Sequence, residues 1–350
     1  MSNKSIKIDG RAIGVDYPPF VIAEMSANHN GNLENALKLI ETAKNCGADA
    51  VKLQTYTPDT ITLNLDTEDF RIHGGLWDGR TLYDLYKEAH MPWDWHKPLF
   101  EHARKLGITI FSSPFDNTAI DLLEDLNAPA YKIASFEVID LPLVKYAAST
   151  GKPLILSTGM ASEFEIIEAI EAAKAGGCSE LAVLHCVSGY PAPAEDYNLR
   201  TIPDMINRFG LVTGLSDHTL DNTTAITSIA LGASIVEKHF TLDRFGGGPD
   251  DSFSIEPTEL KALCADIRTA WNSLGSIDYS QKSSEVGNLK FRRSLYFIKD
   301  MKEGEIITHE CIRSVRPGFG LPPKVINDLM GKVMTKTVDY GTAVKKEHYE

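Results

Sequence analysis

The sequence of 350 residues predicts an α/β fold, a (β/α)8 barrel followed by a small β-rich domain. The first observation is that eight short apolar, β-branched runs recur along the chain, most of them separated by stretches with helical periodicity. The second is that these runs are apolar almost throughout, as parallel strands buried on both faces must be. Eight βα units within about 270 residues fit a closed barrel better than the alternative, an open doubly wound sheet.

The expected strands follow one another along residues 20–240. They are FVIAE (20–24), AVKLQ (50–54), ITIFSS (108–113), AYKIAS (130–135), PLILSTG (153–159), LAVLHC (181–186), LVTGLSDH (211–218) and SIVEKHF (234–240). Asn32 and Ser162 are expected to begin two of the intervening helices, because apolar residues follow each at helical spacing. Glu165, three residues after Ser162, adds the pattern of a capping box. Residues 56–106 exceed one loop, so we expect a loop and a helix there on the barrel rim.

Two domain boundaries are expected, near residues 274 and 290. Residues 1–274 would form the barrel, with its last helix near 257–273. Residues 275–290 are polar and poor in apolar side chains, which is typical of a linker. Residues 291–350 contain short strand-like pieces punctuated by glycine, and they are too few to bury much core alone. This domain is therefore expected to pack against something larger.

The composition of the chain indicates which partners and which cellular compartment to expect. The 35 basic and 48 acidic residues give a net charge of −13, which disfavours nucleic acid and anionic membrane as partners. The five cysteines are odd in number and form no C-x-x-C pair, so we expect reduced thiols. The N-terminus has no signal-peptide pattern, and 18 uninterrupted apolar residues occur nowhere. A cytoplasmic location is the expectation.

Polar side chains stand at the end of every expected strand. They are Glu24, Lys52, Gln54, Ser112, Ser113, Lys132, Ser135, Ser157, Thr158, His185, Ser216, Asp217, His218, Glu237, Lys238 and His239. The active site of a (β/α)8 barrel lies at the carboxyl ends of its strands. One polar end would indicate a turn, but eight in succession predict a polar floor above an apolar barrel, the arrangement of an enzyme site.

Two lysines are the most distinctive of these residues. Lys52 and Lys132 each lie inside an apolar run, where lysine is rare unless it is paired or functional. With the nearby hydroxyls of Ser135, Ser157 and Ser216 they would form a pocket for phosphate or carboxylate. A lysine that forms a Schiff base with a carbonyl substrate is the competing role, and a lysine that only reaches from a strand end to water is the structural alternative.

Histidines end the last two strands. His218 and His239 would stand on neighbouring strands, close enough to share a divalent metal and leave open positions for water and substrate. His185 is a candidate third ligand or outer hydrogen-bond donor, and His29 is a weaker candidate. Glu24 ends the first strand and is expected to act as a general acid or base or to accept a substrate hydroxyl.

The motifs that carry these residues resemble the sialic acid synthase family, the phosphoenolpyruvate-dependent nonulosonic acid synthases. The matching pieces are IAEMSANHNG, DAVKLQTYTP, FSSPFD, PAYKIAS, GKPLILSTGM, HCVSGYPAP, GLSDHT, EKHFTLD, GGPDDSFSIEP and RPGFG, in the family's order along nearly the whole chain. The resemblance implies a barrel joined to a C-terminal antifreeze-like (SAF, β-clip) domain. In the implied domain-swapped homodimer, that domain caps the partner's active site.

The resemblance also implies roles for single residues. A divalent cation would bind His218 and His239, with Mn²⁺ expected and Co²⁺ or Mg²⁺ as alternatives. Phosphoenolpyruvate would be held by Lys52, Ser113, Lys132, Ser135, Ser157, Ser188 and Ser216, although Ser188 stands where N-acetylneuraminate synthases tend to carry Asn. An N-acylated amino sugar would contact Glu24, Gln54, Tyr190, Asp250 and, from the partner chain, Arg316. The catalytic set would be Glu24, Lys52, Lys132, His218 and His239.

Within the family, the stretches LWDGRTLYDLYKEA and EKHFTLDRFGGGPDDSFSIEP look most like the branch that makes pseudaminic acid from 2,4-diacetamido-2,4,6-trideoxy-L-altrose. The N-acetylneuraminate and legionaminate branches are the alternatives. A Schiff-base aldolase or a metal-dependent hydrolase on the same barrel is an alternative of another class. A non-catalytic carbohydrate-binding or ice-binding protein is a further one, against which the polar strand ends argue.

Overall fold

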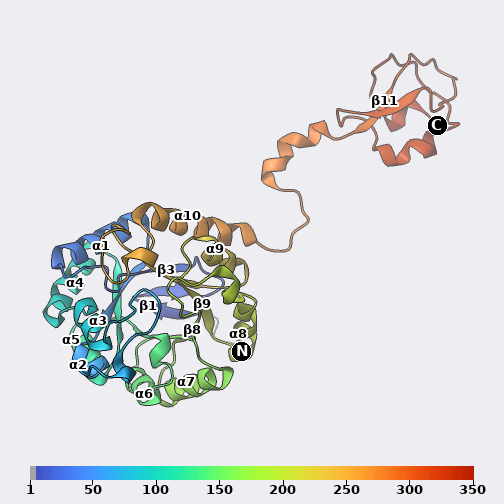
Figure 1. The fold of residues 1–350 in the computed structure, drawn as a ribbon. Helices are drawn as coiled ribbons and strands as arrows, with labels where there is room; N and C mark the ends of the chain where they lie inside the picture. Colours follow the sequence, from blue (N-terminus) through green and yellow to red (C-terminus); the bar gives the residue numbers. More distant parts are fainter. Residues whose placement is uncertain (1–4) are drawn as a thin grey trace. The chain divides into compact units, whose positions relative to one another are not determined.

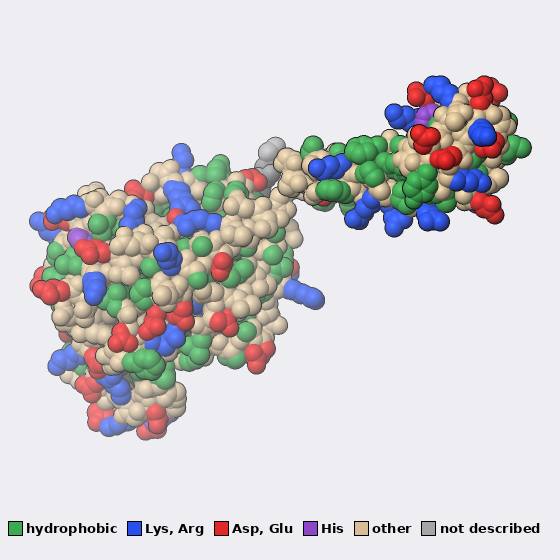
Figure 2. All heavy atoms as spheres, turned by 90° about the horizontal axis from the view of Figure 1, so that it is seen from above, with side chains coloured by type: hydrophobic (Ala, Val, Ile, Leu, Met, Phe, Trp, Pro, Cys, Tyr) green, Lys and Arg blue, Asp and Glu red, His purple; other side chains and the backbone are tan. Residues whose placement is uncertain are grey.

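The structure is a computed structural model that describes residues 5–350. The chain divides into two compact units, one that ends at Gly275 and one that spans Ser276–Glu350 (Figure 1). On the face of the first unit seen in Figure 2, basic and acidic side chains are interspersed. Across residues 5–350, the structure contains no helix long and apolar enough to cross a membrane.

Eight parallel strands close into a barrel in the first unit, which confirms the predicted fold class. Their order around the barrel is β10-β3-β4-β5-β6-β7-β8-β9, and β9 pairs with β10 to complete the ring. The strands are β3 (Phe20–Glu24), β4 (Ala50–Thr55), β5 (Thr109–Pro114), β6 (Tyr131–Ile133), β7 (Leu154–Ser157), β8 (Leu181–Cys186), β9 (Val212–Asp217) and β10 (Ile235–His239). All eight fall within the apolar runs expected as strands, or extend one residue past them.

Helices surround these strands on the outside (Figure 1). The Asn32 side chain caps α1 by accepting from the backbone N–H of Glu34 and Asn35, and Ser162 forms the expected capping box with Glu165 on α7. The helices are α1 (Leu33–Cys46), α2 (Pro58–Ile61), α3 (Leu82–Ala89), α4 (Trp93–Leu106), α5 (Asn117–Asp125), α6 (Leu141–Ser149), α7 (Glu163–Ala175), α8 (Thr201–Phe209), α9 (Thr223–Ala230) and α10 (Pro257–Leu274).

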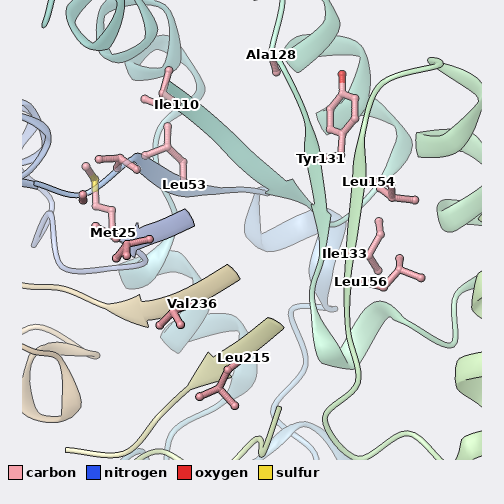
Figure 3. Close-up of a cluster of buried hydrophobic side chains, with 14 of the residues drawn as sticks. Met25, Leu53, Ile110, Ala128, Tyr131, Ile133, Leu154, Leu156, Leu215 and Val236 are labelled. Atoms are coloured by element: carbon pink, nitrogen blue, oxygen red, sulfur yellow. The ribbon is translucent and has the colours of Figure 1, made fainter. Parts of the chain in front are cut away.

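Alternation along the strands separates two apolar layers. Outward-facing side chains pack under the helices, and Figure 3 shows part of this layer, including Leu53, Ile110 and Leu215. Inward-facing side chains such as Phe20 and Phe111 fill the lower barrel in a second cluster, and on β3 and β8 two of its members stand two positions apart. Each strand is therefore buried on both faces, as its apolar sequence requires.

A short hairpin closes the amino-terminal end of the barrel. Its strands, β1 (Ile6–Ile8) and β2 (Arg11–Ile13), are antiparallel, and Asp9 and Gly10 turn between them with φ of 50° and 78°. Isoleucines of both strands belong to the same cluster as the inward-facing barrel residues. The hairpin therefore acts as an apolar plug opposite the carboxyl ends of the strands.

The second unit has a small core of its own. Strands β11 (Ser294–Phe297) and β12 (Ile312–Val315) pair antiparallel, and isolated bridges join the remaining segments. A 3₁₀ helix (Ser283–Phe291) precedes them, and another (Pro323–Leu329) follows. The buried core consists of Leu295, Phe297, Met301, Ile307, Cys311, Ile312, Leu329, Met334, Val338 and Val344.

Candidate active site

The inward-facing side chains change from apolar to polar at the carboxyl ends of the strands. On β10, for example, Ile235 belongs to the barrel core, and Glu237 and His239 follow it on the same face. The polar ends expected from the sequence therefore divide between two faces. Asp217 and Lys238 face outward, where the lysine Nζ donates to the carboxylate at 2.7 Å, and they are a structural ion pair, not part of the site floor.

A buried cluster of four charges forms the centre of the site. Lys52 Nζ lies 3.1 Å from Glu24 Oε2 and 3.4 Å from Glu237 Oε1, and it donates to Ser113 Oγ at 3.1 Å. Lys132 Nζ donates to the same Glu237 oxygen at 3.1 Å. The two predicted lysines thus lie on either side of one buried carboxylate, which offsets part of their positive charge.

The two carboxyl groups have opposite protonation tendencies. Burial raises the pKa of Glu24 to about 7 against the opposing charge of Lys52. Burial also favours the neutral form of Glu237, but the charges of Lys132 and Lys52 outweigh it and hold the pKa at about 2. Glu237 is therefore a fixed anion, whereas Glu24 can gain or lose a proton near neutral pH.

The lysines also differ from each other. For Lys52, burial opposes the charged form, but the carboxylates of Glu237 and Glu24 outweigh it and raise the pKa. For Lys132, burial outweighs the attraction of Glu237 and lowers the pKa. Glu237 Oε2 and Ser157 Oγ are both buried without a hydrogen-bond partner among the described residues. A bound anion would accept from the Ser157 hydroxyl, and a water molecule would donate to Glu237 Oε2.

Three of the predicted serines line this cluster, and a glycine makes room for a fourth. Ser216 Oγ lies 3.4 Å from Glu237 Oε1 as a donor. Ser135 Oγ accepts from the backbone N–H of Gly159 at 3.2 Å. A Cβ on Gly159 would stand 2.7 Å from Ser135 Oγ and would also overlap Ser188 Oγ. The absence of a side chain at this position therefore lets both hydroxyls converge.

Replacing Gly159 by alanine should force the Ser135 and Ser188 hydroxyls to rotate away while the fold survives. We expect the KM for an anionic substrate to rise by about tenfold, the effect of losing roughly one hydrogen bond to a charged group. Steady-state kinetics and a thermal melt measure the two effects. An unchanged KM would show that neither hydroxyl contacts the anion.

The two predicted metal histidines lie side by side. Their ring centroids are 5.4 Å apart. His218 Nδ1 donates to the backbone carbonyl of Val187 at 2.7 Å, so Nε2 is the nitrogen that could bind a metal, as is usual for metal-ligating histidine. The Cys186 thiol also interacts with this imidazole. His239 Nδ1 is buried without a hydrogen-bond partner. The pair could supply two imidazole ligands to a divalent cation. No group of three or more His, Cys, Asp or Glu that could hold a metal occurs in residues 5–350.

Three of the predicted sugar contacts, Glu24, Gln54 and Asp250, are joined by a chain of hydrogen bonds beside the lysines. Gln54 Nε2 donates to Glu24 Oε1 and to Ser26 Oγ, both at 2.9 Å. The Ser26 hydroxyl in turn donates to Asp250, whose pKa is raised by burial. The Tyr190 ring stacks at a tilt on His218, with centroids 4.3 Å apart. These polar side chains can therefore exchange their present hydrogen bonds for bonds to the hydroxyls of a sugar.

Two candidates on the barrel lie outside this cluster, and a third belongs to the other unit. His185 faces outward from β8 and bonds the backbone carbonyl of Tyr197. His29 is buried against Trp95, accepts from the backbone N–H of Gly31, and has a pKa that burial lowers to about 4. Arg316 belongs to the second unit, is exposed, and follows β12 directly.

Two inward-facing residues were missed as site residues. Glu237, the carboxylate between the lysines, is the main omission. Cys186 is the other: burial favours its neutral thiol, but His218, Ser135 and Lys132 outweigh that and lower the pKa to about 7. Alternation alone places Glu237 on the inward face, because it precedes His239 by two residues. Glu137, whose pKa burial raises to about 7, also lies near both lysines.

A parallel eight-stranded barrel with a lysine–carboxylate cluster and an imidazole pair at its mouth defines an enzyme of the (β/α)8 class that acts on an anionic substrate. Residues 39–279 match the NeuB family and residues 292–350 the SAF domain. The chain belongs to the NeuB family.

Three known proteins indicate its place in that family. It is 45% identical to the pseudaminic acid synthase of Campylobacter jejuni, over 95% of this chain and 97% of that protein. It is 37% identical to the N,N'-diacetyllegionaminic acid synthase of the same species, over 90% and 96%. The crystal structure of the N-acetylneuraminic acid synthetase of Leptospira borgpetersenii in complex with citrate has a TM-score of 0.73 and 31% identity, over 83% of this chain and 96% of that one.

Proposed function

We propose that this protein is a pseudaminic acid synthase. It condenses phosphoenolpyruvate with 2,4-diacetamido-2,4,6-trideoxy-L-altrose and releases phosphate. The observation that carries the proposal is the position of Lys52 and Lys132, buried on either side of Glu237 and beside the imidazole pair. The choice of branch rests on sequence similarity, which falls from 45% for the pseudaminic acid synthase to 37% and 31% for the two other kinds of synthase.

Different residues of the site bind the two substrates. Lys52 and Lys132 bind the phosphate and carboxylate of phosphoenolpyruvate, with hydroxyls of Ser113, Ser135, Ser157, Ser188 and Ser216 as further donors. Glu24, Gln54, Tyr190 and Asp250 hold the hydroxyls and N-acyl groups of the sugar. A divalent cation on His218 and His239, with Mn²⁺ expected and Co²⁺ or Mg²⁺ as alternatives, would polarise the aldehyde of the open-chain sugar.

The proposed reaction joins the two substrates and expels phosphate. C3 of phosphoenolpyruvate attacks the aldehyde carbon, which forms the new C–C bond, and positive charge develops at C2. Water adds at C2, the C2–O bond to phosphate breaks, and C2 becomes a ketone. Of the two protons of that water, one goes to the former aldehyde oxygen and the other leaves with the phosphate. Glu24, whose pKa lies near neutrality, is placed to transfer a proton at the aldehyde oxygen. The lysines orient and neutralise the anion in a site closed to bulk water.

The competing class is an aldolase that forms a Schiff base on Lys132, whose pKa burial lowers. Phosphate release and borohydride trapping separate the two. The synthase releases phosphate only when phosphoenolpyruvate and sugar are both present, and borohydride leaves it active. Inactivation by borohydride in the presence of substrate, with a mass increase on Lys132, would assign the aldolase instead.

We also place the active form as a domain-swapped homodimer in the cytoplasm. The five cysteines are all free, as a reducing compartment allows. Arg316 is exposed on a unit with a small core, and no hydrogen bond or ion pair within residues 5–350 holds its guanidinium. In the dimer it donates to an N-acyl group of the sugar bound to the partner's barrel.

Mixed dimers test this role of Arg316. Arg316→Ala should raise the KM for the sugar or lower turnover without loss of the fold. When Arg316→Ala chains are paired with Lys52→Ala chains, one site per dimer keeps both residues if the arginine acts across the interface. Activity of the mixture above that of either parent is the expected result. Mixed dimers as inactive as their parents would place the arginine in its own chain's site or outside catalysis.

A further inference from the structure

Trp77 reaches the mouth of the site from a segment that the proposed reaction does not use. It lies between β4 and α4, where the chain is longer than a simple loop. Its Nε1 donates to the backbone carbonyl of Pro249 at 3.1 Å, next to the candidate sugar residue Asp250. Its ring centroid stands 6.2 Å from that of Tyr190 and 6.4 Å from that of Phe253.

Tyr190 and Phe253 connect this tryptophan to the imidazole pair. The Tyr190 ring lies 4.3 Å from the ring of His218, and the Phe253 ring lies 5.1 Å from the ring of His239. The two aromatic rings are 5.3 Å from each other. Phe253 is buried, whereas Trp77 and Tyr190 stay partly exposed. Trp77, Tyr190 and Phe253 therefore form an aromatic wall that begins at the imidazoles and continues outward.

The outer part of the wall, Trp77 and Phe253, is apolar, whereas Tyr190 adds one phenol hydroxyl. Phe253 carries no polar atom, and the indole N–H of Trp77 is already donated to Pro249. A hydroxyl placed against these two rings, which stand edge to face, would lose its hydrogen bonds to water without gaining new ones, which is costly. A methyl group there would instead bury apolar surface.

We propose that the aromatic wall binds the deoxygenated end of the sugar, with Trp77 as the residue that selects a methyl group at C6 over a hydroxymethyl group. This rests on the proposed function for the identity of the sugar, 2,4-diacetamido-2,4,6-trideoxy-L-altrose, which has a methyl at C6. Its aldehyde is at the opposite end of the carbon chain, beside His218 and His239. The end farthest from the aldehyde is the one that can reach past Tyr190 and Phe253 to Trp77.

The test compares sugars that differ only at C6. One pair is 2,4-diacetamido-2,4,6-trideoxy-L-altrose and its 6-hydroxy counterpart, and the second is 6-deoxy-N-acetylmannosamine and N-acetylmannosamine. The wild type should prefer the deoxy member by up to about 100-fold in kcat/KM, the discrimination an apolar pocket gives against an added hydroxyl. Trp77→Ala should remove most of this preference through a higher KM for the deoxy sugar, with kcat little changed. Trp77→Phe should keep part of the preference for the deoxy sugar.

Leu76→Ala is the matched control, because Leu76 is the exposed neighbour of Trp77 and should leave the preference intact. The proposal is overturned if the wild type prefers the hydroxy member of the pair it accepts. It is also overturned if Trp77→Ala lowers kcat/KM equally for both members, which would make Trp77 only a support for its segment. If the enzyme accepts only the N-acetylmannosamine pair, the proposed function is refuted. That pair would still measure whether the enzyme prefers a methyl or a hydroxymethyl group at C6.

Discussion

Replacement of Lys132 or Lys52 by alanine should lower kcat/KM for phosphoenolpyruvate by about 30-fold to several thousand-fold. The expectation follows from the roughly 2–5 kcal/mol that truncating one partner of a desolvated charge pair costs, at about 1.4 kcal/mol for each factor of ten. Either change also leaves Glu237 with one cation in place of two, so its negative charge repels the incoming anion. Steady-state kinetics with phosphoenolpyruvate as the varied substrate measures the effect.

Lys238→Ala is the control for the loss of a buried ion pair as such. Lys238 is as buried as the two site lysines and donates to Asp217 at 2.7 Å, but it faces the helices. This variant should lower the melting temperature and leave the KM for phosphoenolpyruvate unchanged. Wild-type dependence on phosphoenolpyruvate in both Lys52→Ala and Lys132→Ala would refute the anion pocket.

Removal of the imidazoles should abolish turnover. His218→Ala and His239→Ala each leave one protein ligand for a divalent cation. A metal held by only two protein ligands and exchangeable water is bound weakly, so the loss of one ligand should abolish binding. Chelator should inactivate the wild type, and Mn²⁺, Co²⁺ or Mg²⁺ should restore it. Titration calorimetry with Mn²⁺ alone gives a readout independent of activity, in which both variants should lose the binding isotherm of the wild type.

His185→Gln is the matched control for the metal site. His185 precedes Cys186 on β8 but faces outward, where it bonds the carbonyl of Tyr197. We expect this variant to bind Mn²⁺ with wild-type affinity. Wild-type turnover by a metal-depleted variant that lacks both His218 and His239 would show that the reaction needs no metal at this site.

The barrel was predictable because its sequence signals are redundant. Every strand is apolar on both faces, and helix caps such as Asn32 and Ser162 mark the helices between strands. The amino-terminal hairpin was missed although its signal is present. IKI alternates apolar and polar side chains, RAI ends in an isoleucine, and the two flank an Asp-Gly pair, which is a strong hairpin signal. A three-residue strand gives too short a pattern to stand out by itself.

The site was predictable as a set of strand ends but not as an arrangement. Lys52 and Lys132 stood out because lysine is unexpected in an apolar strand. Glu237 did not, since a carboxylate next to Lys238 and His239 is indistinguishable from an ordinary polar strand end. Alternation from His239 places Glu237 inside and Lys238 outside. Its pairing with two lysines, by contrast, depends on barrel closure, which sets β10 beside β3 and across from β6.

The most direct measurement of the central claim is mass spectrometry of the products formed from phosphoenolpyruvate with each of three candidate sugars. These are 2,4-diacetamido-2,4,6-trideoxy-L-altrose, its D-manno counterpart that leads to legionaminic acid, and N-acetylmannosamine. The account predicts that the L-altrose derivative is converted with the highest kcat/KM to a nine-carbon acid of the mass of pseudaminic acid, with one phosphate released per product. Preferential conversion of either other sugar, or no condensation with any of them, would contradict it.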